Sequence, residues 1–315
     1  MPRQPSSSSR TSRKKASGPS APSDLWGRSP AQEIASQLDL LRSVAGDPAS
    51  LRATATEFAR HSGNLEVMKA AITALGGMED AGNREVLHEV YGRCTDRTDA
   101  GGFIRAAVIR ALQPIVSEAD RPLLMTALAT YQTQGLYEIC GDLRTAALVA
   151  MNDLDPDLAA FFAAGFLQDP GNAVSGQPGS TAIRVLAAQQ KLELPYALAS
   201  WGQGPPDLLG EMLRNLVDLP APLVDRLVDL YRDHEDEQVL LGLFDLLLGH
   251  AERARWRGEI VAFLETTGMI DLYGLIVMQI VASRDGDLIA ALRRLERTEP
   301  VRRKAELLNL ALQHA

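Results

Sequence analysis

The sequence has few aromatic residues and very few cysteines, and both shortages restrict the folds open to it. Phe, Trp and Tyr make up 5% of the 315 residues, whereas Ala and Leu are abundant. This composition favours closely packed helices over a sheet-based core. The two cysteines, Cys94 and Cys140, lack metal-binding spacing and imply no disulfide framework. We therefore expect a reducing, cytoplasmic location.

Long apolar runs are also missing. The two longest near-continuous runs, Val239 to Leu248 and Leu272 to Val281, are each about half of a membrane-spanning segment. The N-terminal residues lack the apolar stretch of a secretory signal. The sequence therefore predicts a soluble chain with no membrane span.

Charge is divided unevenly along the chain. Residues 1–30 carry six bases and one acid, so the remainder has a net charge of −13 within a total of −8. The first residues are rich in Ser, Pro and Arg, and they cannot bury enough apolar surface to offset their ordering entropy. We predict a disordered basic tail over residues 1–29. It could serve only for solubility, bind nucleic acid or another anionic surface through residues 1–30, or act in targeting.

From about Pro30 onward, apolar residues recur at helical spacing in segments of some ten to sixteen residues. Turn sequences such as Gly46-Asp47-Pro48, Asp155-Pro156 and Leu219-Pro220 separate these segments. No alternating strand of useful length is present. The sequence thus predicts an all-α fold.

Alternate helical segments also share a pattern of apolar and small residues, often with a base at the second position. VMKAAITAL, IRAAVIRAL and LRTAALVAM are the clearest examples. The eight copies start at Val67, Ile104, Leu143, Ile183, Leu209, Val239, Tyr273 and Val301. Spacings of 26 to 40 residues between successive starts fit one helical pair per repeat.

These segments resemble the HEAT-repeat family, most closely at Ser62 to Ala71 and at Gly141 to Ala147. The resemblance implies a right-handed α-α superhelix, or α-solenoid, of about eight helical pairs. We expect a capping helix at 30–48, regular repeats over 49–191 and degenerate repeats over 192–315. On the last helix, we expect Arg302, Arg303, Lys304 and Glu306 to form a hydrated capping surface.

Two enzyme families that resemble this architecture were considered. HEAT-like di-iron hydroxylases converge four His-Glu pairs on one metal site, whereas this chain has only His88-Glu89 and His234-Glu235. HEAT-like DNA glycosylases need a basic concave surface with aromatic residues, but the body is acidic, and Trp201 and Trp256 lie in different parts of the chain. No phosphate loop or nucleophile elbow is present. We expect no catalytic residue, cofactor or metal.

Arg105, Arg144 and Arg184 occupy equivalent places in successive repeats. In one interpretation, each guanidinium bridges carboxylates or carbonyls of a neighbouring repeat. In the other, the row captures an acidic or phosphorylated partner. We favour the structural interpretation.

The helical segment from Val239 is apolar on both faces. Alignment with Ile104 predicts Val239, Gly242, Leu243, Leu246 and Leu247 as core positions. The opposite face and the equivalent face of the next such helix then form a candidate partner-binding groove: Leu240, Leu241, Phe244, Leu248, Leu275 and Met278. Alternatively, neighbouring repeats bury these residues.

Two irregular stretches, Gln168 to Thr181 and Ser200 to Pro206, flank one repeat. We expect the first to be an unstructured loop. Together they mark either a hinge between two halves or an ordinary insertion.

The sequence therefore favours a non-catalytic HEAT-repeat scaffold or adaptor that binds another protein through its concave surface. The alternatives are a nucleic-acid-associated HEAT protein that uses the basic tail, and a HEAT-like enzyme.

Overall fold

The computed structural model describes residues 29–313. Within that range the chain forms eighteen α-helices, some short 3₁₀ turns and one two-stranded sheet, so the predicted all-α class is confirmed. The tail predicted over residues 1–29 lies outside the described range except for Ser29. That residue is the N-cap of α1 (Pro30–Ser43) and forms a capping box with Gln32.

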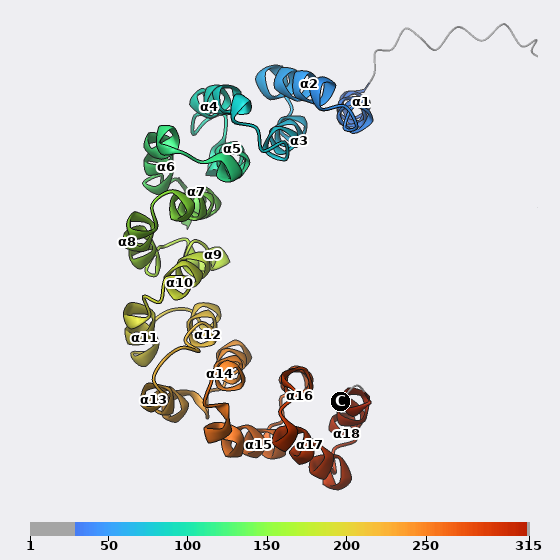
Figure 1. The fold of residues 1–315 in the computed structure, drawn as a ribbon, viewed down its shortest axis with the longest axis vertical. Coiled ribbons are helices and arrows are strands. Elements are labelled where there is room, and N and C mark those ends of the chain that lie inside the picture. The colour runs from blue at the N-terminus through green and yellow to red at the C-terminus, as the bar shows by residue number, and fades with distance from the viewer. Residues whose placement is uncertain (1–28, 314–315) are drawn as a thin grey trace, which may run out of the picture.

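The helices follow an arc in two layers (Figure 1). The outer, convex layer contains α2 (Pro48–His61), α4 (Arg84–Arg93), α6 (Arg121–Leu128), α8 (Pro156–Phe166), α11 (Glu193–Ser200), α13 (Ala221–Tyr231), α15 (Arg257–Thr266) and α17 (Gly286–Thr298). The inner, concave layer contains α3 (Leu65–Gly76), α5 (Phe103–Leu112), α7 (Gly141–Leu154), α10 (Gly179–Ala188), α12 (Pro206–Arg214), α14 (Glu237–Gly249), α16 (Ile270–Ser283) and α18 (Arg302–Leu312). All eight predicted copies fall on these inner helices, the last one beginning at the N-cap of α18.

Acidic and amide side chains in the turns define where many helices begin. Asp47 accepts hydrogen bonds from the backbone N–H groups of Ala49 and Ser50, and Pro48 is the first residue of α2. Asn64 and Asp236 cap α3 and α14 in the same way. These caps satisfy amide groups that have no partner within the helix.

The hydrophobic core consists of two clusters that both include residues of α5. Ile104, Val108 and Leu112 belong to the smaller, N-terminal cluster, whereas Ala106 and Ile109 belong to the larger one. The larger cluster includes residues on both sides of each irregular stretch and extends to Ala311. The core is therefore continuous at 168–206, where a hinge was considered, and it divides at α5.

The closest approach within the inner layer joins α12 to α14. A Cβ atom added to Gly242 would overlap the backbone of Gly210, and one added to Gly210 would overlap the carbonyl of Gln238. Only glycine permits this helix spacing. This contact packs one face of α14 closely against α12.

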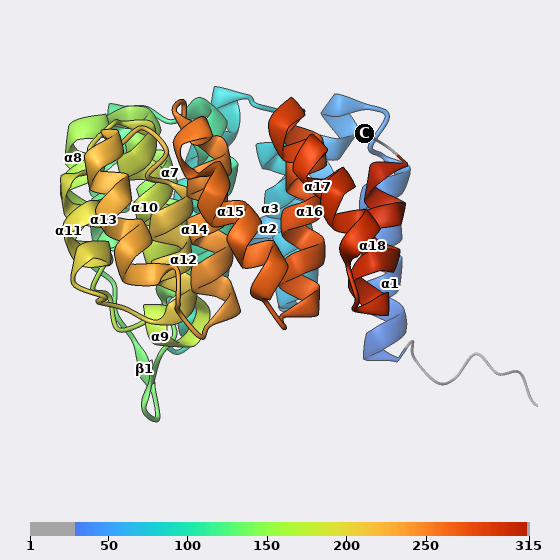
Figure 2. The same cartoon turned by 90° about the horizontal axis from the view of Figure 1, so that it is seen from below.

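One short element was not predicted, and one local prediction was wrong. A β-hairpin of β1 (Thr133–Gln134) and β2 (Tyr137–Glu138) links α6 to α7, and it stands out from the helices in Figure 2. Gly135 turns it with a φ of 63°. The stretch from 168 to 181 is not unstructured, because it contains the short helix α9 (Asn172–Ser175) and the start of α10.

The last helix is less hydrated than its sequence suggests. Arg302 and Arg303 are exposed and pair with Glu306. Lys304 is instead buried: its ammonium group donates to the carbonyl of Leu264 at 3.0 Å and lies 4.8 Å from the ring centre of Tyr273. One predicted surface residue therefore fastens α18 to the body.

Across residues 29–313, no helix is both long enough and apolar enough to cross a bilayer.

Candidate concave interaction surface

The concave face carries a hollow of about 540 Å³ between α3 and α5. Lys69 and Thr73 of α3 line one side, and Phe103 and Arg110 of α5 line the other. The Lys69 ammonium group lies 5.0 Å from the ring centre of Phe103. We call this feature the α3–α5 hollow.

The α3–α5 hollow contains charges of both signs that are not neutralised locally. Within the described residues, neither Lys69 nor Arg110 forms an ion pair, and the same holds for the acids Glu79 and Asp142 at its rim. Phe103 is half-exposed beside them. An aromatic ring among unpaired charges of both signs suits a polypeptide segment better than a ligand with charge of one sign.

Farther along the inner layer, charged side chains connect successive helices. Arg184 of α10 pairs with Glu211 of α12 at 2.8 Å, and Arg214 of α12 lies 3.5 Å from the carboxylate of Asp245 on α14. Gln279 of α16 donates to Asp245 at 2.6 Å. Burial raises the pKa of Asp245, although Arg214 and Gln279 oppose this rise. These contacts form an inner-layer polar ladder across four helices.

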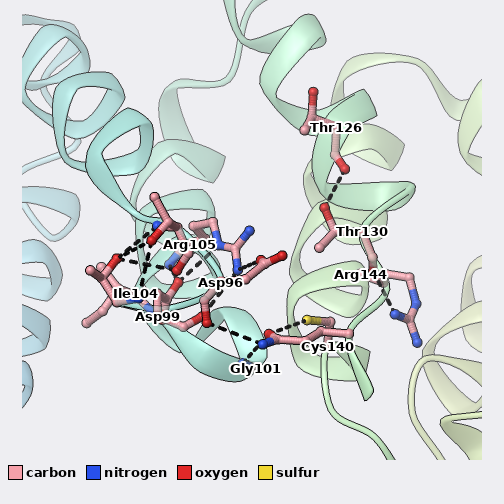
Figure 3. Close-up of polar contacts among 12 residues, drawn as sticks. Asp96, Asp99, Gly101, Ile104, Arg105, Thr126, Thr130, Cys140 and Arg144 are labelled. Carbon is pink, nitrogen blue, oxygen red and sulfur yellow. Dashed lines mark hydrogen bonds and ion pairs between the residues drawn. The ribbon is translucent and has the colours of Figure 1, made fainter. Parts of the chain in front are cut away.

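The first arginine of the predicted row, Arg105, is buried within its own repeat. Its guanidinium donates to Asp99 and to Asp96, each at 3.1 Å, as Figure 3 shows. Asp99 also accepts the backbone N–H groups of Ile104 and Arg105 at the start of α5. Arg105 therefore braces the preceding loop and does not bridge to a neighbouring repeat.

The second arginine, Arg144, is fully buried and bridges two turns. It donates to both carboxylate oxygens of Glu138 on the hairpin, at 2.9 and 2.6 Å, and to Asp169 after α8 at 2.7 Å. The Tyr131 ring stacks 3.9 Å from the guanidinium carbon. Burial opposes ionisation of Glu138, but hydrogen bonds from Arg144 and from backbone N–H groups hold its pKa below the ordinary value.

Gln132 joins the surroundings of these two arginines. Its side-chain oxygen accepts from the backbone N–H of Gly101 at 2.9 Å, and its amide nitrogen donates to the carbonyl of Asp96. Its own backbone N–H donates to Glu138. The network fixes the hairpin base against two neighbouring turns.

The arginine row is thus not an open row of guanidinium groups. Arg105 and Arg144 are buried and each pairs with two carboxylates, and the exposed Arg184 is paired with the next inner helix. Arg144 and Arg184 each contact a carboxylate of the next helical pair, whereas Arg105 contacts only carboxylates of the loop before α5.

The predicted groove on α14 is largely closed. The five predicted core positions, Val239, Gly242, Leu243, Leu246 and Leu247, are all buried. However, Leu240, Phe244 and Leu248 are buried as well, and Leu241 is half-buried.

The reason is that the second face of α14 meets the outer layer. The ring of Phe244 lies 4.5 Å from that of Phe263 on α15. Apart from Glu237 at its start, α14 retains exposure along one line, at Gln238, Leu241, Asp245 and Gly249. Leu275 and Met278 of α16 remain about half exposed, as predicted for a surface.

The two His-Glu pairs lie apart and have local partners. His88 on α4 contacts Asp120 at 2.6 Å, and the neighbouring Glu89 pairs with Arg60. The ring of His234, in the α13–α14 turn, accepts the backbone N–H of Asp236. In the described part of the chain, no group of three or more His, Cys, Asp or Glu side chains could hold a metal ion.

Sequence reasoning missed the α3–α5 hollow. Lys69 and Arg110 stand within two of the clearest repeat copies, but charged residues occupy the same positions in other copies, for example Glu211 and Asp245, so charge alone did not mark the hollow. The outward direction of these positions became evident only with the helix packing. The comparisons supply no further guide: no protein-family model matches the chain, and neither curated proteins nor solved structures give a significant match.

Proposed function

We propose that this chain is a non-catalytic HEAT-like α-solenoid, a scaffold or adaptor that binds another protein through its concave surface. Eight successive pairs of outer and inner helices support the solenoid assignment. Stacked helical pairs create extended concave surfaces of the kind that repeat proteins use for recognition.

The α3–α5 hollow is the observation that carries the proposal. It offers a half-exposed aromatic ring, flanking cations and acids at the rim. Aromatic and arginine side chains dominate binding energy at protein interfaces. We propose that Phe103 and Arg110 anchor a partner segment, with Lys69 positioned beside the ring.

Charge favours a protein over nucleic acid as the partner. The chain after residue 30 has a net charge of −13, which would repel a phosphate backbone over most of its surface. The nucleic-acid alternative depends on the basic residues 1–30, nearly all outside the described range. Deleting residues 1–28 separates the two proposals, because concave binding should survive the deletion.

Affinity capture with quantitative mass spectrometry tests the proposal. Full-length protein and the variants Arg110→Glu and Phe103→Ala would be compared with two controls on α13, Arg226→Glu and Leu230→Ala. Arg226 is exposed and unpaired among the described residues, and Leu230 is 49% exposed against 48% for Phe103. We expect specific partners to be lost from both hollow variants and kept by both controls. Equal recovery from all five proteins would refute the assignment of the hollow.

A further inference from the structure

Three consecutive turns along one edge of the molecule expose no charge. They comprise residues 130–140 before α7, 167–178 around α9 and 200–206 before α12. Their only charged residues are Glu138 and Asp169, and both are buried against Arg144. The chain as a whole has 23% charged residues, so we call these three turns the uncharged edge.

Specific contacts hold the first two turns side by side, and a groove lies between the second and the third. Tyr131 donates from its hydroxyl group to Asp169 at 3.0 Å, and Arg144 bridges Glu138 to the same carboxylate. A groove of about 360 Å³ separates the second turn from the third, and residues 167–173 and 203–205 line it. Figure 2 shows the hairpin and α9 on the same side of the molecule.

The uncharged edge combines a protruding knob with a neighbouring groove. Leu136 at the hairpin tip is 97% exposed, and Tyr137 is exposed beside it. Leu167, Pro170, Leu198 and Leu208 give the groove apolar walls. Val174 and Trp201 are exposed on the second and third turns. Depletion of charge and enrichment in Tyr and Trp are typical of protein–protein interface cores.

The buried network behind the hairpin fixes the base of the hairpin that carries Leu136, so the hairpin is preorganised for binding. Arg144 holds Glu138 through two hydrogen bonds, and Gln132 links the hairpin base to the loop before α5. A fixed loop loses little conformational entropy on binding. An exposed leucine on such a support therefore points to a specific contact.

We propose that the uncharged edge is a two-fold contact between two copies of this chain, in which Leu136 of each copy enters the groove of the other. A two-fold contact needs a knob and a complementary hollow on the same surface, and this edge has both. Charge supports the choice of occupant. Two bodies of net charge −13 repel each other at contact distances, where salt screens weakly, and this edge brings no exposed charge into the contact.

Sedimentation analysis of the full chain over a concentration series tests this proposal. We expect a reversible monomer–dimer equilibrium that added salt does not weaken, because no ion pair crosses the contact. Leu136→Asp and Trp201→Asp should each raise the dimer dissociation constant by about tenfold or more. The control Phe161→Asp, at a 77% exposed residue on the outer helix α8, should leave it unchanged. Circular dichroism melts would establish that all variants fold.

A cross-linking experiment tests the geometry. Copies carrying Leu136→Cys would be mixed with copies carrying Ala173→Cys, since Ala173 is exposed and lines the groove. Disulfide-linked dimers should form in the mixture and not from either variant alone. A chain that stays monomeric, a dimer that survives Leu136→Asp, or the absence of mixed cross-links would overturn the proposal. Binding at the α3–α5 hollow is independent of these outcomes, because Leu136→Asp should still capture the concave partner.

Discussion

Two pairs of adjacent inner helices, α3–α5 and α12–α14, differ in how far the helix faces outside the main core are exposed. Between α3 and α5 the concave side opens into a hollow that exposes Phe103 and Arg110. Between α12 and α14 the backbones approach at Gly210 and Gly242, and α14 buries Leu240 and Phe244 as well as its expected core face.

Local hydrophobicity explains only part of this difference. α14 needs cover on nearly all sides, and it obtains that cover from α12 on one side and from Phe263 of α15 on another. α5 carries the small Ala107 and the charged Arg110 on the side that lines the hollow, and it leaves Phe103 half-exposed there. In this molecule contact with a further helix, as between Phe244 of α14 and Phe263 of α15, decides whether a second apolar face becomes core or surface.

The largest expected effect comes from exchanging an aromatic residue at each site. Phe244→Ala should lower the free energy of unfolding by about 3–5 kcal/mol, because it leaves a cavity in the larger core cluster. Phe103→Ala should change it by less than about 1 kcal/mol while weakening partner capture. Urea denaturation of both variants measures the contrast. Similar losses of stability would remove the distinction between the closed and open helices.

The same comparison can be made within the arginine row. Arg144→Gln leaves the buried carboxylates of Glu138 and Asp169 without their main partner, so stability should fall by about 3–5 kcal/mol. Arg184→Gln breaks one largely exposed pair with Glu211 and should cost at most about 1 kcal/mol. Thermal melts would show the order. Equal shifts would mean that Arg144 is not the central bridge of its network.

The helix spacing can be tested directly with an added methyl group. Gly242→Ala forces α14 away from Gly210, and overpacking of this kind costs about 1–3 kcal/mol. Gly165→Ala on α8 has open space around the new methyl group and should stabilise its helix by about 0.5–1 kcal/mol. Opposite signs in chemical denaturation would confirm that glycine sets the α12–α14 spacing. A neutral Gly242→Ala would show that the inner layer adjusts freely.

The sequence predicted the helical class and all eight inner helices because apolar periodicity and turn residues are local signals. Whether the second apolar face of a helix is exposed depends on residues that are distant in the sequence. Phe244 and Met278 looked equivalent in the sequence, yet one meets α15 and the other remains at the surface. Lys304 was misassigned for the same reason, since its acceptor, the carbonyl of Leu264, lies 40 residues away.

The hairpin was missed because its strands contain only two residues each. Too few positions exist for an alternating pattern, and the hairpin depends instead on Gly135 and on the partners of Glu138. The uncharged edge could have been found from sequence by counting charges turn by turn. Its three segments start 37 and 33 residues apart, as one repeat period requires.

The smallest expected effect is on the pH dependence of stability, to which the carboxyl groups of Glu138 and Asp245 contribute with opposite signs. The pKa of Glu138 is lowered in the folded chain, so its stabilisation is fully present above its unfolded pKa, about 4.3, and is lost as pH falls through the lower folded value. The pKa of Asp245 is raised by burial. The folded state therefore takes up this proton first, and stability gained at Asp245 partly offsets the acid loss.

Substitution should separate these opposite contributions. Glu138→Gln should make the decline of stability below about pH 4 shallower, although the variant starts from a lower stability. Asp245→Asn removes the offset, so its stability relative to the parent should worsen as pH falls from the folded pKa of Asp245 toward about 3.9. Urea unfolding at a series of pH values measures both slopes. Parallel slopes for the two variants would show that the carboxylate at the hairpin and the carboxylate on α14 experience the same electrostatic environment, contrary to the contacts that surround them.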